Sequence, residues 1–212
     1  MSERQAGHHC QIYLGLSGLP ADGAEDMFEQ TLRTGRVACA LLGAAAMARF
    51  GEALSRALID LAHRNGVPVL VENDAGLAKS LGVDGVHLDG RRNSQNAVLE
   101  ARALVGAEAI IGAEAGLSRH AAMVSGEYGA DYISFGDPSH QHHHEIGQIA
   151  DMVQWWVELF EICCVAWHRG GLDEAKLLAD SGADFLAVDD FVWNAGGEPA
   201  RALEALDCAL RS

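Results

Sequence analysis

The sequence predicts an α/β fold, a (β/α)8 TIM barrel. Short apolar segments alternate with helical segments along the chain, and such strands belong in a parallel sheet that is covered on both faces. A glycine, a small residue and an aspartate precede three of the apolar segments, as Gly82-Val83-Asp84, Gly129-Ala130-Asp131 and Gly182-Ala183-Asp184. Glycine suits the left-handed position that ends a helix, and the aspartate can hold the tight turn that follows. Three copies of this turn predict a repeated β/α architecture.

The first half of the barrel is predicted from apolar runs that are separated by glycine stops. The expected strands are Gln11–Leu16, Val37–Leu42, Val67–Val71 and Gly85–Leu88. The expected helices are Ala24–Thr34, Ala44–Arg64 and Ala75–Leu81. Gly35, Gly66 and Gly82 follow these helices, as expected for residues that end a helix.

The second half continues the same alternation. The expected strands are Ala109–Gly112, Tyr132–Phe135, Ile162–Trp167 and Phe185–Val188. The expected helices are Ala97–Val105, a segment from the cap Ser118 to Tyr128, Ile149–Glu161, Leu172–Ser181 and Ala200–Leu210. Arg91–Asn96 and Asp137–Glu145 are polar and are expected to be loops.

An open doubly wound sheet is the alternative fold. It usually has fewer strands and a Gly-rich turn after the first one, whereas Leu16-Ser17-Gly18-Leu19-Pro20 does not match GxGxxG. Eight expected strands in 212 residues fit a small barrel as one domain over residues 1–212, with residues 1–10 as a disordered terminus. A barrel places its active site at the carboxyl ends of the strands, so the residues just after each strand carry the functional information.

Composition excludes several classes of partner. The formal net charge is −15, which disfavours nucleic acid and anionic membrane surfaces because both are bound by clustered Lys and Arg. No apolar run reaches the ~20 residues that span a bilayer, and the amino end lacks the hydrophobic segment of a signal peptide. The five cysteines follow no CxxC spacing, which favours reduced thiols and a cytoplasmic location.

Four stretches resemble a known family. They are VPVLVENDAGLAKSLGVDGVHLDG, AIIGAEAGLSRHAAMVSGEYGADYISFGDP, CCVAWHRGGLDEAKLLADSGADFLAVDDFVWN and the shorter QIYLGLSG. Together they resemble the thiamine phosphate synthase / TenI family from about Gln11 to Asn194. The resemblance implies a small TIM barrel that joins a pyrimidine diphosphate to a thiazole phosphate with Mg²⁺, or one that tautomerises the thiazole.

The resemblance suggests a metal site after the third and fourth strands. The family carries Asn-Asp-Arg after its third strand, where the aspartate binds Mg²⁺, and the ungapped match here is Glu72-Asn73-Asp74. A second acid is usual after the fourth strand, and Asp89 can stand in for it. The candidate metal ligands are therefore Glu72, Asn73, Asp74 and Asp89. Asp74 has a structural alternative, since an aspartate at the head of a helix is a standard N-cap.

The expected substrate-binding residues are Gly170, Gly171, Glu114 and Asp189. Gly170 and Gly171 match the family's paired glycines, whose backbone can approach a phosphate, or they simply permit a tight turn. Glu114 lies near the position of the family's Ser or Thr, and Asp189-Asp190 replaces a small Ser-Ala pair. Cys39–Ala44, after the second strand, holds neither the Arg nor the Lys that binds diphosphate in the family. Two unit charges of like sign ~4 Å apart repel by ~4 kcal/mol at intermediate dielectric.

Other chemistry-bearing residues have structural explanations. The loop histidines His140, His142, His143 and His144 are potential metal ligands, but a solvated loop is the favoured interpretation because adjacent histidines seldom meet one ion. His87 alternates with apolar neighbours and is expected to be a hydrogen-bonded strand residue. Trp155, Trp156 and Trp193 are expected to serve packing or subunit contacts.

Three functions remain open at this level. The first is thiamine phosphate synthesis, by resemblance, with weak or lost catalysis because the basic residues are missing. The second is a non-catalytic barrel that binds a different, less anionic small molecule or a protein partner. The third is a metal-dependent enzyme that uses the new acids with the loop histidines. A small-molecule ligand is expected in each enzymatic case, and barrels of this kind are frequently homo-oligomers.

Overall fold

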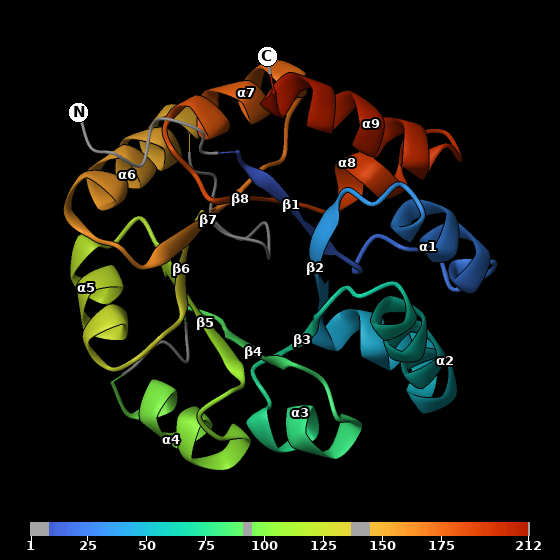
Figure 1. Cartoon of the computed structure of the whole chain (residues 1–212), viewed down its shortest axis with the longest axis horizontal. Helices are drawn as coiled ribbons and strands as arrows, with labels where there is room; N and C mark the ends of the chain where they lie inside the picture. The colour runs from blue at the N-terminus through green and yellow to red at the C-terminus, as the bar shows by residue number, and fades with distance from the viewer. Residues whose placement is uncertain (1–8, 91–94, 137–144, 212) are drawn as a thin grey trace.

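A computed structural model of the chain describes residues 9–90, 95–136 and 145–211. Eight parallel strands hydrogen bond in the order β1 to β8, and β8 pairs with β1 to close the sheet. The helices form a ring around this barrel (Figure 1). The predicted (β/α)8 barrel is therefore confirmed. The predictions for residues 1–8 and for the loop histidines at 140–144 lie outside the described residues.

The elements follow the predicted order. The strands are β1 Gln11–Gly15, β2 Val37–Leu42, β3 Val69–Glu72, β4 Gly85–Leu88, β5 Ile110–Gly116, β6 Tyr132–Phe135, β7 Cys163–Trp167 and β8 Phe185–Val188. The helices are α1 Ala24–Leu32, α2 Ala44–Arg64, α3 Ala75–Leu81, α4 Gln95–Val105, α5 Arg119–Glu127, α6 Ile146–Leu159, α7 Leu172–Asp180, α8 Asp190–Trp193 and α9 Pro199–Leu210.

Several elements begin or end up to three residues from their predicted bounds, and two differ more from the sequence prediction. Strand β5 continues to Gly116, past the predicted end at Gly112, with an irregular register beyond Glu114. Helix α8 was not predicted, because a four-residue helix is too short to show the 3.6-residue periodicity on which helix prediction rests. Both differences fall at carboxyl ends of strands, where the chain leaves the regular sheet.

The repeated Gly-x-Asp turn ties neighbouring strands together. The glycine at the head of each turn has a positive φ, 68° at Gly82, 92° at Gly129 and 100° at Gly182, as expected for a left-handed helix end. Each aspartate accepts a hydrogen bond from a backbone N–H at the start of the preceding strand. The pairs are Asp84 with Val69 at 2.7 Å, Asp131 with Ile111 at 2.7 Å and Asp184 with Cys164 at 2.8 Å.

The core has two parts. The larger part lies between the strands and the helices and includes the fully buried Phe28 and Trp156. The smaller part fills the barrel lumen and includes Tyr13, Tyr132 and Trp167. Burial of one large apolar side chain stabilises a fold by roughly 1.5–3 kcal/mol. Trp156 contributes to the outer core through its burial, which confirms its predicted packing role.

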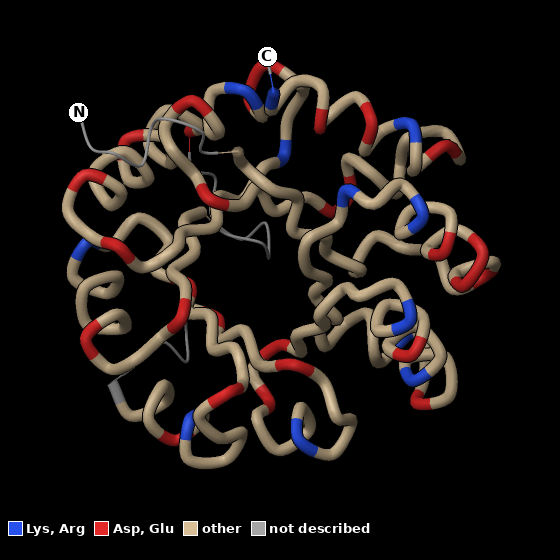
Figure 2. The backbone as a smooth tube through the Cα atoms, in the orientation of Figure 1, with Lys and Arg blue, Asp and Glu red and all other residues tan. Residues whose placement is uncertain are grey.

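The described residues contain no helix with the length and apolarity that a membrane crossing requires. All five cysteines lie within the described ranges, and none of them forms a disulfide. Acidic residues are spread over the whole ring of helices (Figure 2), in keeping with the net charge of −15.

Candidate functional site

The barrel brings the predicted site residues to one end. Glu72, Glu114 and Asp189 belong to, or directly follow, the carboxyl ends of β3, β5 and β8, and Asp89 directly follows β4. Parallel strands that close into a barrel end on the same side, so these acids share one rim. We call this end of the barrel the mouth.

Asp189 binds the loop that follows β1. Its Oδ2 accepts a hydrogen bond from the N–H of Ser17 at 2.9 Å, and its Oδ1 accepts one from the N–H of Gly18 at 2.7 Å. A Cβ at Gly15 would collide with the same carboxylate. Burial raises the pKa of Asp189 to about 6, although the two N–H donors act in the opposite direction. The carboxylate thus occupies two backbone N–H groups of the loop that follows β1.

Glu72 binds the amino end of α2. Its Oε2 accepts a hydrogen bond from the N–H of Ala44 at 3.1 Å, and the N-cap residue Gly43 offers no side chain for that purpose. The amino end of a helix presents unpaired N–H groups and a partial positive charge, which favour an anion. Here a carboxylate of the chain itself is that anion.

Gly170 and Gly171 lie at the amino end of α7, with Gly171 as its N-cap. A Cβ at Gly170 would collide with the carboxylate of Glu174, so this acid lies directly against the predicted phosphate cradle. Nε2 of His168 lies 2.9 Å from the carbonyl oxygen of Gly171 and fixes the turn. Sequence reasoning missed Glu174, whose position four residues past Gly170 on the next helix was the available signal.

The predicted metal ligands make hydrogen bonds within the chain. Oδ1 of Asp74 accepts the N–H of Leu77 at 2.8 Å, which confirms the N-cap interpretation. Asn73 has a φ of 62° and exchanges two hydrogen bonds of 2.8 Å with Asp89.

Among the described residues, no three His, Cys, Asp or Glu side chains are grouped so that they can hold a metal ion. Mg²⁺ is usually held by one or two carboxylates together with water and substrate oxygens, so the metal site at Glu72, Asn73, Asp74 and Asp89 stays a prediction.

A polar chain crosses the lumen below the mouth. Nδ1 of His87 lies 2.8 Å from the hydroxyl of Tyr132, which lies 3.0 Å from the hydroxyl of Tyr13. Burial lowers the pKa of His87 to about 4, so the imidazole is neutral near pH 7. The hydrogen bond confirms half of the prediction for His87, since Nε2 has no partner among the described residues.

Two other buried polar atoms on the lumen strands also lack a partner in the described part of the chain. They are Nε1 of Trp167 and Oγ of Ser134. Buried polar groups are nearly always hydrogen bonded in native proteins, so these atoms are candidates to contact water or a ligand. Together with His87 they make the lumen uncharged but capable of hydrogen bonding.

Two arginines at this end of the barrel are absent from the site residues that the sequence predicts. Nη2 of Arg49, on α2, donates to the carbonyl oxygens of Ser17 and Leu19, each at 2.8 Å, and so holds the loop that Asp189 binds. Arg169 is exposed and directly precedes Gly170.

Comparisons with known proteins place this geometry in a family. Residues 21–190 match a family model described as "Thiamine monophosphate synthase". A thiamine-phosphate synthase of Rhodospirillum centenum is 37% identical over 165 residues, which cover 76% of this chain and 78% of that protein. A thiamine-phosphate synthase of Hyphomonas neptunium is 37% identical over 158 residues, which cover 74% of this chain and 70% of that protein.

Solved structures show the same fold. A thiamine phosphate pyrophosphorylase from Pyrococcus furiosus superposes with a TM-score of 0.76 at 20% identity, covering 96% of each chain. A 3-hexulose-6-phosphate synthase from Salmonella typhimurium superposes with a TM-score of 0.76 at 16% identity, covering 95% of this chain and 98% of that one. At such identities the likeness concerns the barrel rather than its chemistry.

Proposed function

The chain belongs to the thiamine monophosphate synthase family, and from that membership we propose that it is a thiamine phosphate synthase-like barrel with weak or lost catalysis. Its mouth binds a ligand that is less anionic than a diphosphate. The observation that supports this proposal is the contact of Asp189 with the N–H groups of Ser17 and Gly18.

The carboxylates oppose a diphosphate in two ways. They hydrogen bond to N–H groups that a phosphate oxygen needs, at Ser17, Gly18 and Ala44. They also repel the ligand, since two like charges ~4 Å apart cost ~4 kcal/mol at an effective dielectric of ~20. A cost of that size reduces affinity by roughly a thousandfold.

The transition state of the synthase reaction also needs hydrogen-bond donors or cations around the diphosphate. Diphosphate leaves a carbon atom of the pyrimidine, so negative charge grows on its oxygens as the bond breaks. That charge is stabilised by preorganised donors or cations. Glu72, Glu174 and Asp189 instead bring carboxylates to this end of the barrel, so the described residues offer little stabilisation.

The mouth and lumen suit a different ligand. The rim is acidic, and the lumen below it holds Tyr132 and Trp167 with a neutral His87. An uncharged or cationic ligand avoids the repulsion at the rim. His87, Ser134 and Trp167, on the strands below the rim, have buried polar atoms that lack partners among the described residues.

A turnover assay tests the proposal. Purified protein is given the pyrimidine diphosphate, the thiazole phosphate and Mg²⁺, and thiamine phosphate is measured by chromatography. We expect no product above a blank without protein. Clear turnover would reject the proposal that catalysis is weak or lost.

The second candidate is a slow synthase with a surviving phosphate site. The observation that favours it is the exposed Arg169 beside Gly170 and Gly171, because a cation next to a helix amino end binds phosphate well. Titration with thiazole phosphate separates the two candidates. Micromolar affinity that falls about tenfold in Arg169→Gln supports this site, whereas weak binding that Arg169→Gln leaves unchanged supports the principal proposal.

A further inference from the structure

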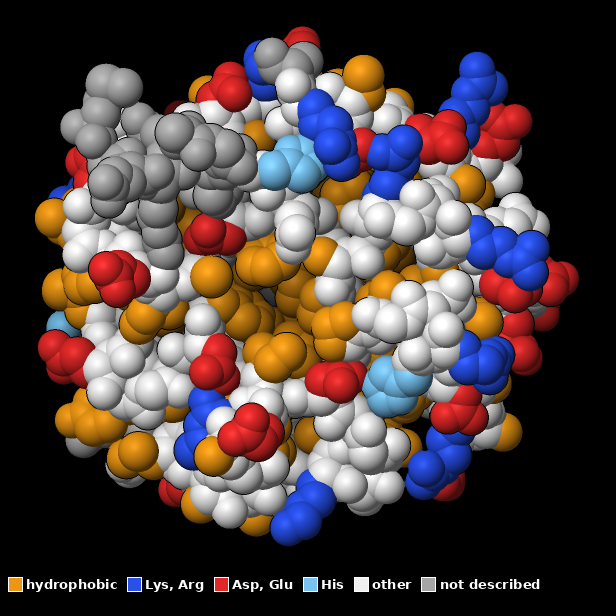
Figure 3. All heavy atoms as spheres, in the orientation of Figure 1, with side chains coloured by type: hydrophobic (Ala, Val, Ile, Leu, Met, Phe, Trp, Pro, Cys, Tyr) orange, Lys and Arg blue, Asp and Glu red, His pale blue; other side chains and the backbone are white. Residues whose placement is uncertain are grey.

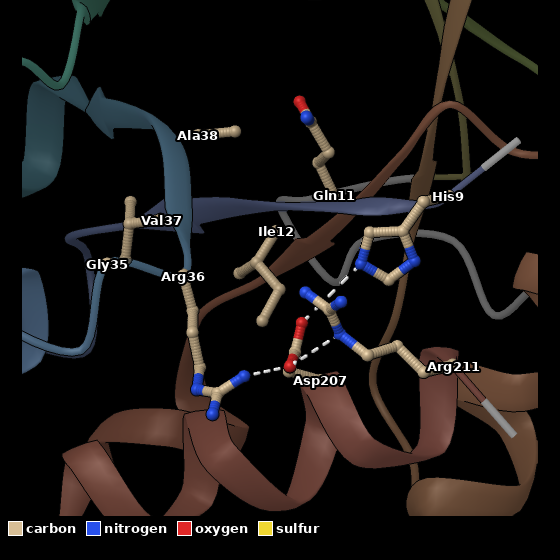
Figure 4. A pocket seen from close by; sticks show the side chains of 9 residues that line it. All are labelled: His9, Gln11, Ile12, Gly35, Arg36, Val37, Ala38, Asp207 and Arg211. Carbon is tan, nitrogen blue, oxygen red and sulfur yellow. Dashed lines mark hydrogen bonds and ion pairs between the residues drawn. The ribbon is translucent and has the colours of Figure 1, made fainter.

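A cavity lies at the opposite end of the barrel from the mouth. It has a volume of about 160 Å³ and lies where β1 and β2 begin, against the carboxyl end of α9. Figure 4 shows the side chains that line it. Its polar lining residues are His9, Gln11, Arg36, Asp207 and Arg211. This cavity plays no part in the function proposed for the mouth.

The cavity marks a break in the repeat. The strand pairs β3–β4, β5–β6 and β7–β8 are each tied by an aspartate of the Gly-x-Asp turn. The pair β1–β2 has Gly35-Arg36-Val37 at this place, without an aspartate, and its register shifts between Ile12 and Tyr13. The first pair therefore carries an arginine where these three pairs carry a structural carboxylate.

The charges in the cavity are predominantly positive. Nη1 of Arg36 and Nε of Arg211 both donate to Oδ2 of Asp207, and Nε2 of His9 lies 3.6 Å from Oδ1. One carboxylate thus faces two guanidinium groups, which leaves an excess of one positive charge before any contribution from His9. This local positive excess favours an anion in the cavity, although the chain as a whole has a net charge of −15.

The donors of the two arginines are incompletely used. A guanidinium has five N–H groups in a planar fork, and Asp207 is the only hydrogen-bond partner of the two guanidinium groups among the described residues. Nε of Arg36 is buried and has no partner in that part of the chain. Arginine forks bind carboxylate and phosphate oxygens in pairs.

We propose that this cavity binds a small oxyanion, a phosphate or a carboxylate, between Arg36 and Arg211. The cavity is large enough for such an ion with some water, since a water molecule occupies about 30 Å³. The bound oxygens satisfy Nε of Arg36 and neutralise the excess charge. They also bring a negative group to the start of β1 and β2, where the chain has Arg36 in place of a turn aspartate.

Calorimetric titration tests this site. Wild-type protein is titrated with phosphate, sulfate and succinate at constant ionic strength, so that general screening does not vary. Arg36→Gln and Arg211→Gln remove one guanidinium each and keep a polar side chain. Arg33→Gln is the control, because Arg33 is an exposed arginine that pairs with Glu29 on the outside of α1. Circular dichroism checks that each variant is folded, and Arg211 is largely exposed near the chain end, so its replacement is tolerated.

The outcomes are distinct. We expect wild type and Arg33→Gln to bind alike and each cavity variant to bind about tenfold more weakly. Preference for phosphate over succinate, or the reverse, identifies the source of the oxyanion. The proposal is overturned if wild type binds none of the three anions, or if Arg211→Gln binds as wild type does. It is also overturned if only Arg169→Gln weakens binding, because the anion would then lie at the mouth.

Discussion

Both ends of the barrel use carboxylates to accept backbone N–H groups, but to different effect. At the amino end, Asp84, Asp131 and Asp184 reach the neighbouring strand from equivalent turns. At the mouth, Asp189 reaches the N–H of Ser17 across 172 residues of sequence, and no repeat relates this contact to the one that Glu72 makes.

The difference shows that a hydrogen bond from a backbone N–H to a carboxylate can either stabilise the fold or exclude a ligand. A carboxylate that joins two strands at the amino end of the barrel takes no N–H group away from a ligand, because those N–H groups would otherwise be buried without a partner. A carboxylate on the N–H groups of a mouth loop takes up donors that a ligand would use. Figure 3 shows, on the face in view, a hollow at the centre of the ring where hydrophobic side chains gather.

The largest expected effect concerns pH and Asp189. Its pKa is raised from 3.8 to about 6, so between these values the folded protein binds a proton that the unfolded chain releases. Wild-type stability therefore decreases as pH rises from 4 to 6. Asp189→Asn cannot titrate and so does not lose this stability. Between pH 4 and 6 its free energy of unfolding should therefore rise relative to that of wild type by up to about 3 kcal/mol, since one pKa unit corresponds to 1.36 kcal/mol. Urea unfolding at several pH values measures the difference in free energy of unfolding between the two proteins. A difference that stays constant with pH would contradict the prediction.

An aspartate of the Gly-x-Asp turns, at the amino end of the barrel, should stabilise the fold at neutral pH. Asp184→Ala leaves the N–H of Cys164 without its acceptor, and we expect a loss of about 2 kcal/mol. Asp184→Asn keeps an oxygen acceptor and should lose less. Denaturant unfolding of both variants gives the comparison. Equal stability of Asp184→Ala and wild type would show that the repeated turn is not held by its carboxylate.

Removal of the mouth carboxylates should restore anion binding. In Glu72→Gln/Asp189→Ser two acids that contact backbone N–H groups become neutral, and we expect the affinity for inorganic pyrophosphate to rise about tenfold, or by about 1.4 kcal/mol. The matched control is Asp151→Asn/Asp180→Asn, which removes the same charge from exposed helix positions. If both double variants gain equally, net charge rather than the occupied N–H groups explains the effect.

The smallest effect is expected at Asp74. Its side chain caps α3, so Asp74→Ala should cost about 1 kcal/mol of stability, and Asp74→Asn should cost little because asparagine caps as well. Neither change should alter the binding of a divalent cation, measured by titration with Mn²⁺. A loss of cation affinity in both variants would instead restore Asp74 as a metal ligand.

The sequence by itself determined the barrel. The glycine stops, the apolar runs and the Gly-x-Asp turns depend on local conformation and short-range order, which a linear pattern records. Hence Val37–Leu42, Gly85–Leu88 and Tyr132–Phe135 were predicted at the residues where the strands lie. The cap at Asp74 was also readable, since a cap involves residues only three apart.

Only the tertiary structure decided what the acids do. Asp189 was visible as a replaced residue, but its partners Ser17 and Gly18 lie at the other end of the chain, and the closure of β8 against β1 brings them together. Glu72 meets Ala44 for the same reason, through the pairing of β2 with β3. A carboxylate is a ligand, a cap or a barrier according to which N–H groups the fold places beside it, and that placement is not encoded in any local stretch.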